Sequence, residues 1–445
     1  MADTKLRIAW FTHLARSNEA VTSISQYCTD LLLPFMKDEF EVEVFAGLPS
    51  GSHHGVPRYN TLNVYQRHRA KPFDIFFYQV EDGPLGRVVR TQVGTMPGIS
   101  WMHDTFLSDP GAEGIHTSPW ERSVQQMLDL SLPFLERGDL PLQPQSQGYR
   151  ETSVSPIVLY NSEWAEGTLH RFLSGRYEYA SCGHRSDTLP VPVPLIEDAR
   201  SQGGARLFEI VALSSTRLDG RAHKFLPALA DCSRPVHLTW VVEPSERMDA
   251  QRMIGEFGVH DRVTLIEGNS PDRWRSLVAK SDIALHLTSN PHTRLSPYLE
   301  LSMAAGVPTV VMRVGRGESL SHDIAFSIEP GLHETAQLLG IFEALGAGDS
   351  RQFGRAGQNL VKDENDPAHV AARLATTFRE SAPLLADVMR AWDGLYKRAE
   401  EALLEEIKAL VDAPTDGMPG AYEMIVKPFV EEVEQGVLKP HVERA

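Results

Sequence analysis

The chain has 445 residues, of which 42% are hydrophobic and 23% charged. At about 150 residues per domain this length predicts two or three domains, and the globular composition excludes general disorder. Forty-three basic and fifty-nine acidic residues give a net charge of −16, which excludes nucleic-acid or anionic-membrane binding by the overall field, so that any phosphate site must be local.

Short apolar runs alternate with helical patterns in the first half of the chain. The runs are almost continuously hydrophobic, which is typical of parallel strands covered by helices on both faces. They span residues 6–11, 40–45, 73–79, 98–103 and 157–160. The pattern predicts an α/β, Rossmann-like, doubly wound domain over residues 1–192.

The same alternation restarts beyond a proline-rich segment at residues 189–194, where alternate prolines fix the backbone and favour extended geometry. Strands are predicted at 208–213, 237–242, 263–266, 283–287 and 309–312, with helices near Phe225, Arg252, Trp274 and Leu301. We therefore expect a second Rossmann-like domain over residues 193–383, facing the first across a cleft.

Residues 384–445 form a predicted helical tail. Apolar residues between Leu385 and Ile407 recur at helical spacing, which indicates one long amphipathic helix. Its apolar face is expected to pack back on the core or against a second copy of the chain in a homo-oligomer. No apolar stretch reaches the about 20 residues of a membrane span, and three cysteines without metal-ligand spacing favour a cytoplasmic protein without disulfides.

Loops that follow the strands are the candidate binding segments, because open α/β sheets bind ligands at the carboxyl ends of their strands. The loop after residues 6–11 lacks the glycines of a dinucleotide fingerprint, which disfavours a nicotinamide enzyme. Arg217, Arg221 and Lys224 follow the strand at 208–213 and precede a helix, whose amino end favours anions. His53 and His54 are expected to be exposed loop residues rather than metal ligands.

Residues 299–310, with the sequence LELSMAAGVPTV, resemble the Glu-Ala-Met-Ala-x-Gly-x-Pro stretch of the GT-B glycosyltransferases, specifically the retaining, nucleotide-sugar-dependent family 4. The resemblance extends over about residues 5–380 and is stronger in the second domain. Further matching residues are His103, Arg217, Lys224, the Asn-Ser-x-Trp segment at Asn161, and Gly268.

The resemblance implies a role for each candidate residue. Arg217 and Lys224 would neutralise the departing diphosphate, and His103 would contact a sugar hydroxyl or organise the acceptor. Glu300 would hold the nucleotide ribose. The remaining candidate substrate-binding residues are His292, Ser296, Gly315, Gly317, Glu318, Asn161 and Gly268.

A retaining, hexosyl-type glycosyltransferase is therefore the predicted function, with a nucleotide diphosphate sugar as donor and a glycan, protein or small molecule as acceptor. No Asp-x-Asp sequence occurs in the chain, so fixed cations would replace a metal, and neither metal nor other cofactor is expected. The alternative is a GT-B-like nucleotide-sugar-binding protein or pseudoenzyme that acts as a non-catalytic partner, because His292 stands where the family has its first Glu.

Overall fold

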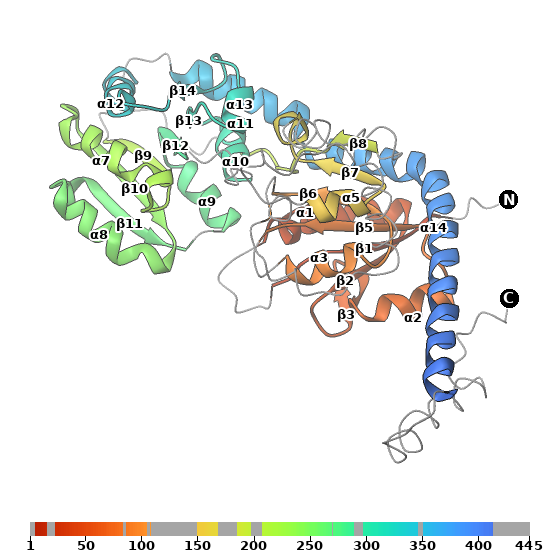
Figure 1. The fold of residues 1–445 in the computed structure, drawn as a ribbon. Coiled ribbons are helices and arrows are strands. Elements are labelled where there is room, and N and C mark those ends of the chain that lie inside the picture. The colour runs from red at the N-terminus through yellow and green to blue at the C-terminus, as the bar shows by residue number, and fades with distance from the viewer. Residues whose placement is uncertain are drawn as a thin grey trace, which may run out of the picture.

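The computed structural model describes residues 5–15, 23–82, 86–104, 107, 149–167, 185–196, 207–268, 270–288, 297–345 and 350–412. These residues form two α/β units, each built on its own sheet, and a long helix returns from the second unit to the first (Figure 1). The prediction of two Rossmann-like units and a C-terminal helix is confirmed.

The first unit contains an eight-stranded sheet in the order β3-β4-β2-β1-β5-β6-β7-β8. All neighbours are parallel except the β3–β4 hairpin at one edge. The strands are β1 (Arg7–Phe11), β2 (Glu41–Ala46), β3 (Gly51–His53), β4 (Val56–Asn60), β5 (Ile75–Val80), β6 (Ile99–Met102), β7 (Ile157–Tyr160) and β8 (Arg185–Thr188). The helices are α1 (Ile24–Glu39), α2 (Asn63–Ala70), α3 (Arg87–Val93) and α5 (Tyr149–Val154).

The second unit contains a six-stranded parallel sheet in the order β11-β10-β9-β12-β13-β14. Its strands are β9 (Phe208–Leu213), β10 (Val236–Val242), β11 (Val263–Glu267), β12 (Ile283–His286), β13 (Thr309–Met312) and β14 (Phe326–Ile328). Its helices are α7 (Ala222–Asp231), α8 (Arg247–Glu256), α9 (Pro271–Val278), α10 (Tyr298–Ala304), α11 (Arg316–Ser319), α12 (Glu334–Ala344) and α13 (Ser350–Glu364).

Two stretches of chain connect the units, and Asn365 links these two stretches by hydrogen bonds. The proline-rich segment makes one crossing, and the passage from α13 to α14 (Pro367–Asp412) makes the other. Asn365, which is 1% exposed, lies between α13 and α14. Its carbonyl oxygen accepts a 2.8 Å hydrogen bond from Val193 N, and its Nδ2 donates to Val191 O at 2.9 Å.

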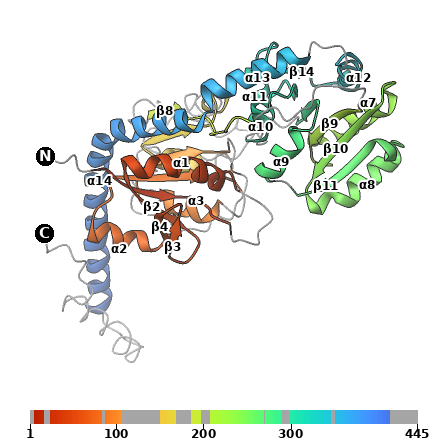
Figure 2. The ribbon, with the colours of Figure 1, turned by 180° about the vertical axis from the view of Figure 1, so that it is seen from behind.

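Helix α14 begins at Pro367, well before the Leu384 start expected from the sequence. Pro383 lies inside the helix and removes one amide donor, which accounts for the change of direction seen in Figures 1 and 2. The helix packs against the first unit: the indole nitrogen of Trp392 donates to Thr95 O at 2.8 Å. The hydroxyl of Tyr396, one turn further along the helix, donates to the same carbonyl at 3.1 Å.

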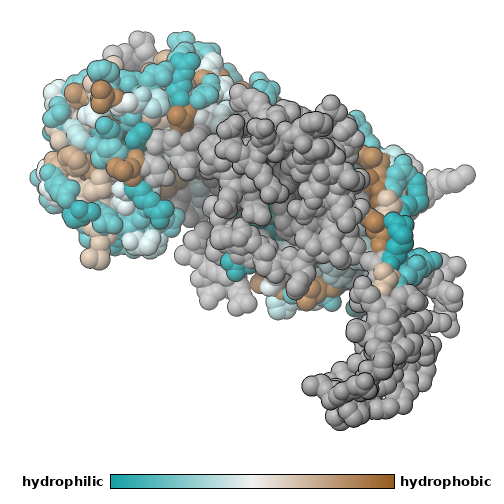
Figure 3. All heavy atoms as spheres, viewed as in Figure 1, coloured by the Kyte–Doolittle hydropathy of each residue, from teal (hydrophilic) through white to brown (hydrophobic). Residues whose placement is uncertain are grey.

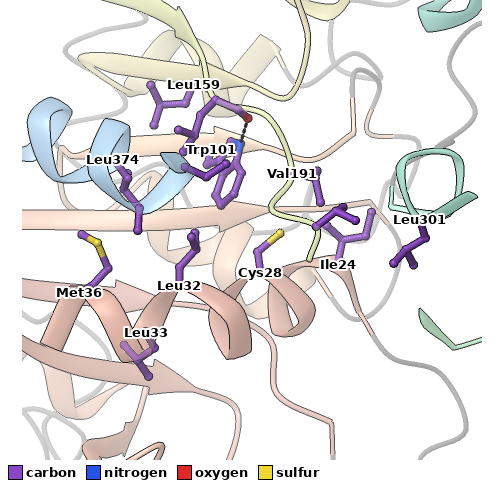
Figure 4. Packing of buried hydrophobic residues seen from close by; sticks show 14 of the residues in the cluster. Ile24, Cys28, Leu32, Leu33, Met36, Trp101, Leu159, Val191, Leu301 and Leu374 are labelled. Atoms are coloured by element: carbon purple, nitrogen blue, oxygen red, sulfur yellow. Dashed lines mark hydrogen bonds between the residues drawn. The ribbon is translucent and has the colours of Figure 1, made fainter. Parts of the chain in front are cut away.

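One apolar cluster is shared by both units (Figure 4). Helix α1 contributes Ile24, Cys28, Leu32, Leu33 and Met36, and these side chains meet residues of β6, β7, the proline-rich segment, α10 and α14. Trp101 donates its indole N–H to Leu189 O at 3.0 Å within this cluster. Burial of a common core fixes the two units against each other through α1.

The visible face of the second unit carries hydrophilic and apolar residues side by side (Figure 3). No helix among the described residues is both long enough and apolar enough to cross a bilayer.

Candidate functional site at the junction of the two units

His103 and Asn161 lie together where two neighbouring parallel strands end. His103 directly follows β6 and Asn161 directly follows β7. The Asn161 Nδ2 donates to His103 O at 2.9 Å. The structure therefore brings together the two candidates that the first unit contributes.

The His103 side chain is 1% exposed and its proton position follows from its neighbours. Its Nε2 lies 3.0 Å from Gln79 Oε1, and Gln79 Nε2 donates to Thr29 Oγ1 at 2.6 Å. Since the Gln79 amide nitrogen is used as that donor, its oxygen must accept, and His103 Nε2 carries the proton. The Nε2–H group of His103 is therefore used within the first unit.

A buried polar network behind His103 was not predicted. Thr29 Oγ1 also accepts the indole N–H of Trp10 at 3.1 Å, and Ser25 Oγ donates to Glu81 Oε1 at 2.9 Å. Ser25 and Thr29 are 0% exposed on α1. The signal that could have found them is their spacing of four residues within the apolar face of α1, where a polar pair needs buried partners.

Glu300 and Arg316 connect the second unit to the first. Glu300, in the first turn of α10, is 1% exposed, and its Oε1 lies 2.9 Å from Arg316 Nε. Arg316 Nη1 donates to Asn161 O at 3.5 Å. Arg316 was not among the sequence candidates, although it stands between Gly315 and Gly317, which were.

Gly315, Gly317 and Glu318 belong to the turn from β13 into the short helix α11. Gly315 has φ 59° and ψ −131°, a conformation that favours glycine. A Cβ at Gly317 would lie 2.0 Å from Met312 O, so close packing accounts for this glycine, while the Glu318 side chain is exposed. The two glycines shape the turn that presents Arg316 to Glu300.

Side chains of α9 and β12 contact Ser302 of α10, the helix that carries Glu300. Ser302 Oγ accepts the indole N–H of Trp274 at 3.1 Å and lies 2.9 Å from His286 Nε2. Complete burial lowers the pKa of His286 to about 3. The ring is therefore neutral at physiological pH and holds α10 through an uncharged contact.

Tyr27 of α1 approaches the same region from the first unit. Its hydroxyl is buried and has no hydrogen-bond partner among the described residues. Burial is the main cause that raises the pKa of Tyr27, and the neighbouring Cys28 raises it further. In the second unit, the charge of Arg275 lowers this pKa and that of Glu300 raises it. Tyr27 is thus a further junction residue that sequence patterning did not reveal.

Arg217 and Lys224 lie on a different segment, between β9 and the amino end of α7. The Arg217 side chain is 83% exposed, with its Nε 3.9 Å from Glu246 Oε1. Lys224, in the first turn of α7, is half-buried, and its ammonium forms no ion pair with any described residue. Neither cation contacts Glu300 within the part of the chain that is described.

The electrostatic environment at the amino end of α7 is positive. Burial, together with the charges of Lys224 and Arg221, lowers the pKa of His223. Arg221, which has φ 62°, is already engaged: its Nε lies 3.3 Å from Oε2 of the buried Glu334. Arg221 is thus paired with Glu334, whereas Lys224 forms no ion pair with any described residue and can meet an anion at the helix amino end.

The remaining sequence candidates are Gly268, His292 and Ser296. Gly268 has φ 72° and follows β11. Its amide donates to Val242 O at 2.9 Å, so that amide is already used within the fold. His292 and Ser296 lie outside the described residues.

No protein-family model matches the chain, and no curated protein sequence matches it. Among solved structures, sucrose-phosphate synthase from Thermosynechococcus elongatus superimposes with a TM-score of 0.60 at 13% identity, over 84% of this chain and 99% of that one. Anabaena HepE in complex with UDP-glucose gives 0.56 at 15% identity, over 84% and 100%. WaaG, a glycosyltransferase involved in lipopolysaccharide biosynthesis, gives 0.53 at 10% identity, over 84% and 99%. Together with the two Rossmann-like units and the returning helix, these similarities show that the chain has the GT-B fold.

Proposed function

We propose that the protein is a glycosyltransferase that moves a sugar from a nucleoside diphosphate sugar to an acceptor hydroxyl. The observation that carries this proposal is made at the amino end of α7. Lys224 has no ion-pair partner among the described residues, and burial together with the charges of Lys224 and Arg221 lowers the pKa of the neighbouring His223. The GT-B fold supports it, since its structural neighbour HepE is seen with UDP-glucose and with UDP.

The departing diphosphate would be stabilised by fixed charges. Lys224 supplies a point charge beside the helix amino end, and the exposed Arg217 supplies a planar fork that can close on the phosphates. With no Asp-x-Asp sequence in the chain, we infer that transfer needs no metal. We further infer retention of configuration, as the family resemblance implies, with a hexose as the transferred sugar.

Glu300 and His103 would place the remainder of the donor. The buried Glu300 carboxylate, held by Arg316, would accept hydrogen bonds from the ribose hydroxyls. His103 of the first unit would contact a sugar hydroxyl or organise the acceptor, as the family resemblance implies. Arg316 bridges Glu300 to Asn161 O, so donor binding and the contact between the units involve the same side chain.

The test is donor binding and hydrolysis with a panel of nucleoside diphosphate sugars in the presence of EDTA. The wild-type protein should bind one donor and release its sugar slowly to water. Lys224→Ala should lower the rate at saturating donor by about 10²–10³, because the lysine faces charge that grows in the transition state. Lys280→Ala, an exposed lysine of the same unit, is the matched control and should leave the rate unchanged.

Four results would count against this function or against part of it. Absence of binding to every nucleoside diphosphate sugar would overturn it, and binding without turnover would instead indicate the non-catalytic alternative. Affinity that disappears with EDTA and returns with Mg²⁺ would refute the metal-independent site. An unchanged rate for Lys224→Ala would remove Lys224 from the leaving-group site.

A further inference from the structure

Two histidines and an aspartate converge at the outer edge of the first sheet. His53 ends β3, His54 begins the turn of the β3–β4 hairpin, and Asp30 belongs to α1. The Asp30 Oδ1 lies 2.7 Å from His53 Nε2 and 3.0 Å from His54 Nε2. One candidate ligand atom from each residue lies within 4.8 Å of the others.

The backbone conformation of the hairpin makes this convergence possible. Successive side chains of an extended strand point to opposite faces, and two neighbouring histidines would not normally reach one carboxylate. His54 has φ 49°, and Gly55 has φ 80°. Lys37 Nζ donates to His54 O at 3.2 Å and holds the turn against α1. The left-handed conformation of His54 turns its ring to the same side as that of His53, with ring centroids 4.6 Å apart.

We propose that Asp30, His53 and His54 form a binding site for a transition-metal ion, of which Zn²⁺ fits the ligand set best. Two imidazoles and one carboxylate are a common set of three protein ligands for zinc, with a water molecule as the fourth. Tetrahedral zinc with bonds of about 2.0–2.1 Å separates its ligand atoms by about 3.3 Å. The two distances from Asp30 Oδ1 to the histidine nitrogens, 2.7 and 3.0 Å, are somewhat shorter than this value, and all three ligand atoms lie within 4.8 Å of one another.

The side chains of Asp30, His53 and His54 are all partly exposed, so an ion can reach them from the solvent. His53 is 19% exposed, less than expected for a loop residue, while Asp30 and His54 are 35% and 41% exposed. On binding, the ion would replace the contacts of both Nε2 atoms with Asp30, and each neutral imidazole would carry its proton on Nδ1. The ion would then fasten the edge hairpin to α1.

Calorimetric titration of tag-free, EDTA-treated protein with ZnCl₂ tests the site, with MgCl₂ as the hard-cation control. The wild-type protein should bind one Zn²⁺ that is lost in His54→Gly, because glycine removes the ligand and also favours φ 49°. Loss of a ligand should weaken binding by at least about 100-fold, the upper value for loss of an outer-shell partner. Asp30→Asn should weaken binding as well.

The matched control is His237→Gln, because His237 Nδ1 pairs with a single carboxylate, Glu209 Oε2, at 3.0 Å. This variant should bind zinc as the wild type does. The proposal is overturned if the wild-type protein binds no zinc, or if His54→Gly binds it with the same stoichiometry and affinity. Equal zinc-induced changes in melting temperature for the wild type and His54→Gly would overturn it too.

Discussion

Acidification should destabilise the protein through His286, the buried histidine beneath the Glu300 helix. Its pKa is about 3 in the folded chain and 6.5 as an ordinary value. Below pH 6.5 the unfolded chain binds a proton that the folded chain does not, so the free energy of unfolding falls with pH until about pH 3. At 1.36 kcal/mol per pH unit, the loss between pH 6.5 and pH 5 is about 2 kcal/mol.

The variant His286→Gln isolates this contribution, because glutamine can still bond Ser302 but does not titrate. Urea unfolding of both proteins at pH 7 and pH 5 should show that the variant loses about 2 kcal/mol less than the wild type on acidification. The control variant His260→Gln, at an exposed position, should lose as much stability on acidification as the wild type. If His286→Gln and wild type lose equal stability between the two pH values, the neutral buried ring inferred here is wrong.

Two further predictions concern packing. Trp392→Ala should lower the free energy of unfolding by about 3–5 kcal/mol, because Trp392 is 9% exposed and its indole N–H donates to Thr95 O. If the variant melts at the same temperature as the wild type, α14 does not stabilise the first unit. Gly317→Ala should cost about 1–3 kcal/mol, since its Cβ would meet Met312 O at 2.0 Å. Gly340→Ala, a helical position where a Cβ meets nothing within 4 Å, should be neutral or stabilising, and equal melting temperatures of the two alanine variants would contradict the packing argument.

The strands with continuous apolar runs were predictable from the sequence, whereas β3, β4, β8 and β14 were not. Every expected apolar run became a strand, because continuous burial requires continuous hydrophobicity, as in β5 with all six residues buried. The edge strands β3 and β8 carry the sequences GSH and RSDT. Their polar composition suits the solvent-exposed edge of a sheet and leaves no hydrophobic pattern to detect.

The site was predictable where local sequence determines it and not where the fold does. Glu300 could be named as a candidate because its surroundings form a contiguous motif, and the structure buries its carboxylate in the first turn of α10. Arg316, Tyr27 and Thr29 escaped detection because their partners lie on other elements, which only the tertiary structure brings close. The start of α14 was placed too late: the apolar spacing was followed only from Leu384 onward, whereas the helix begins at Pro367 and contains Pro383.

Because α14 completes the first unit, that unit cannot finish folding when its own strands leave the ribosome. Phe378 lies edge-on to Phe77 of β5 with ring centroids 5.2 Å apart, and Trp392 covers Thr95. At the 5–20 residues per second of translation, roughly 10–40 s separate the emergence of β8 from that of Trp392. During this interval the face beside α1 is exposed on the nascent chain, and this is the period in which a chaperone would have an apolar surface to bind.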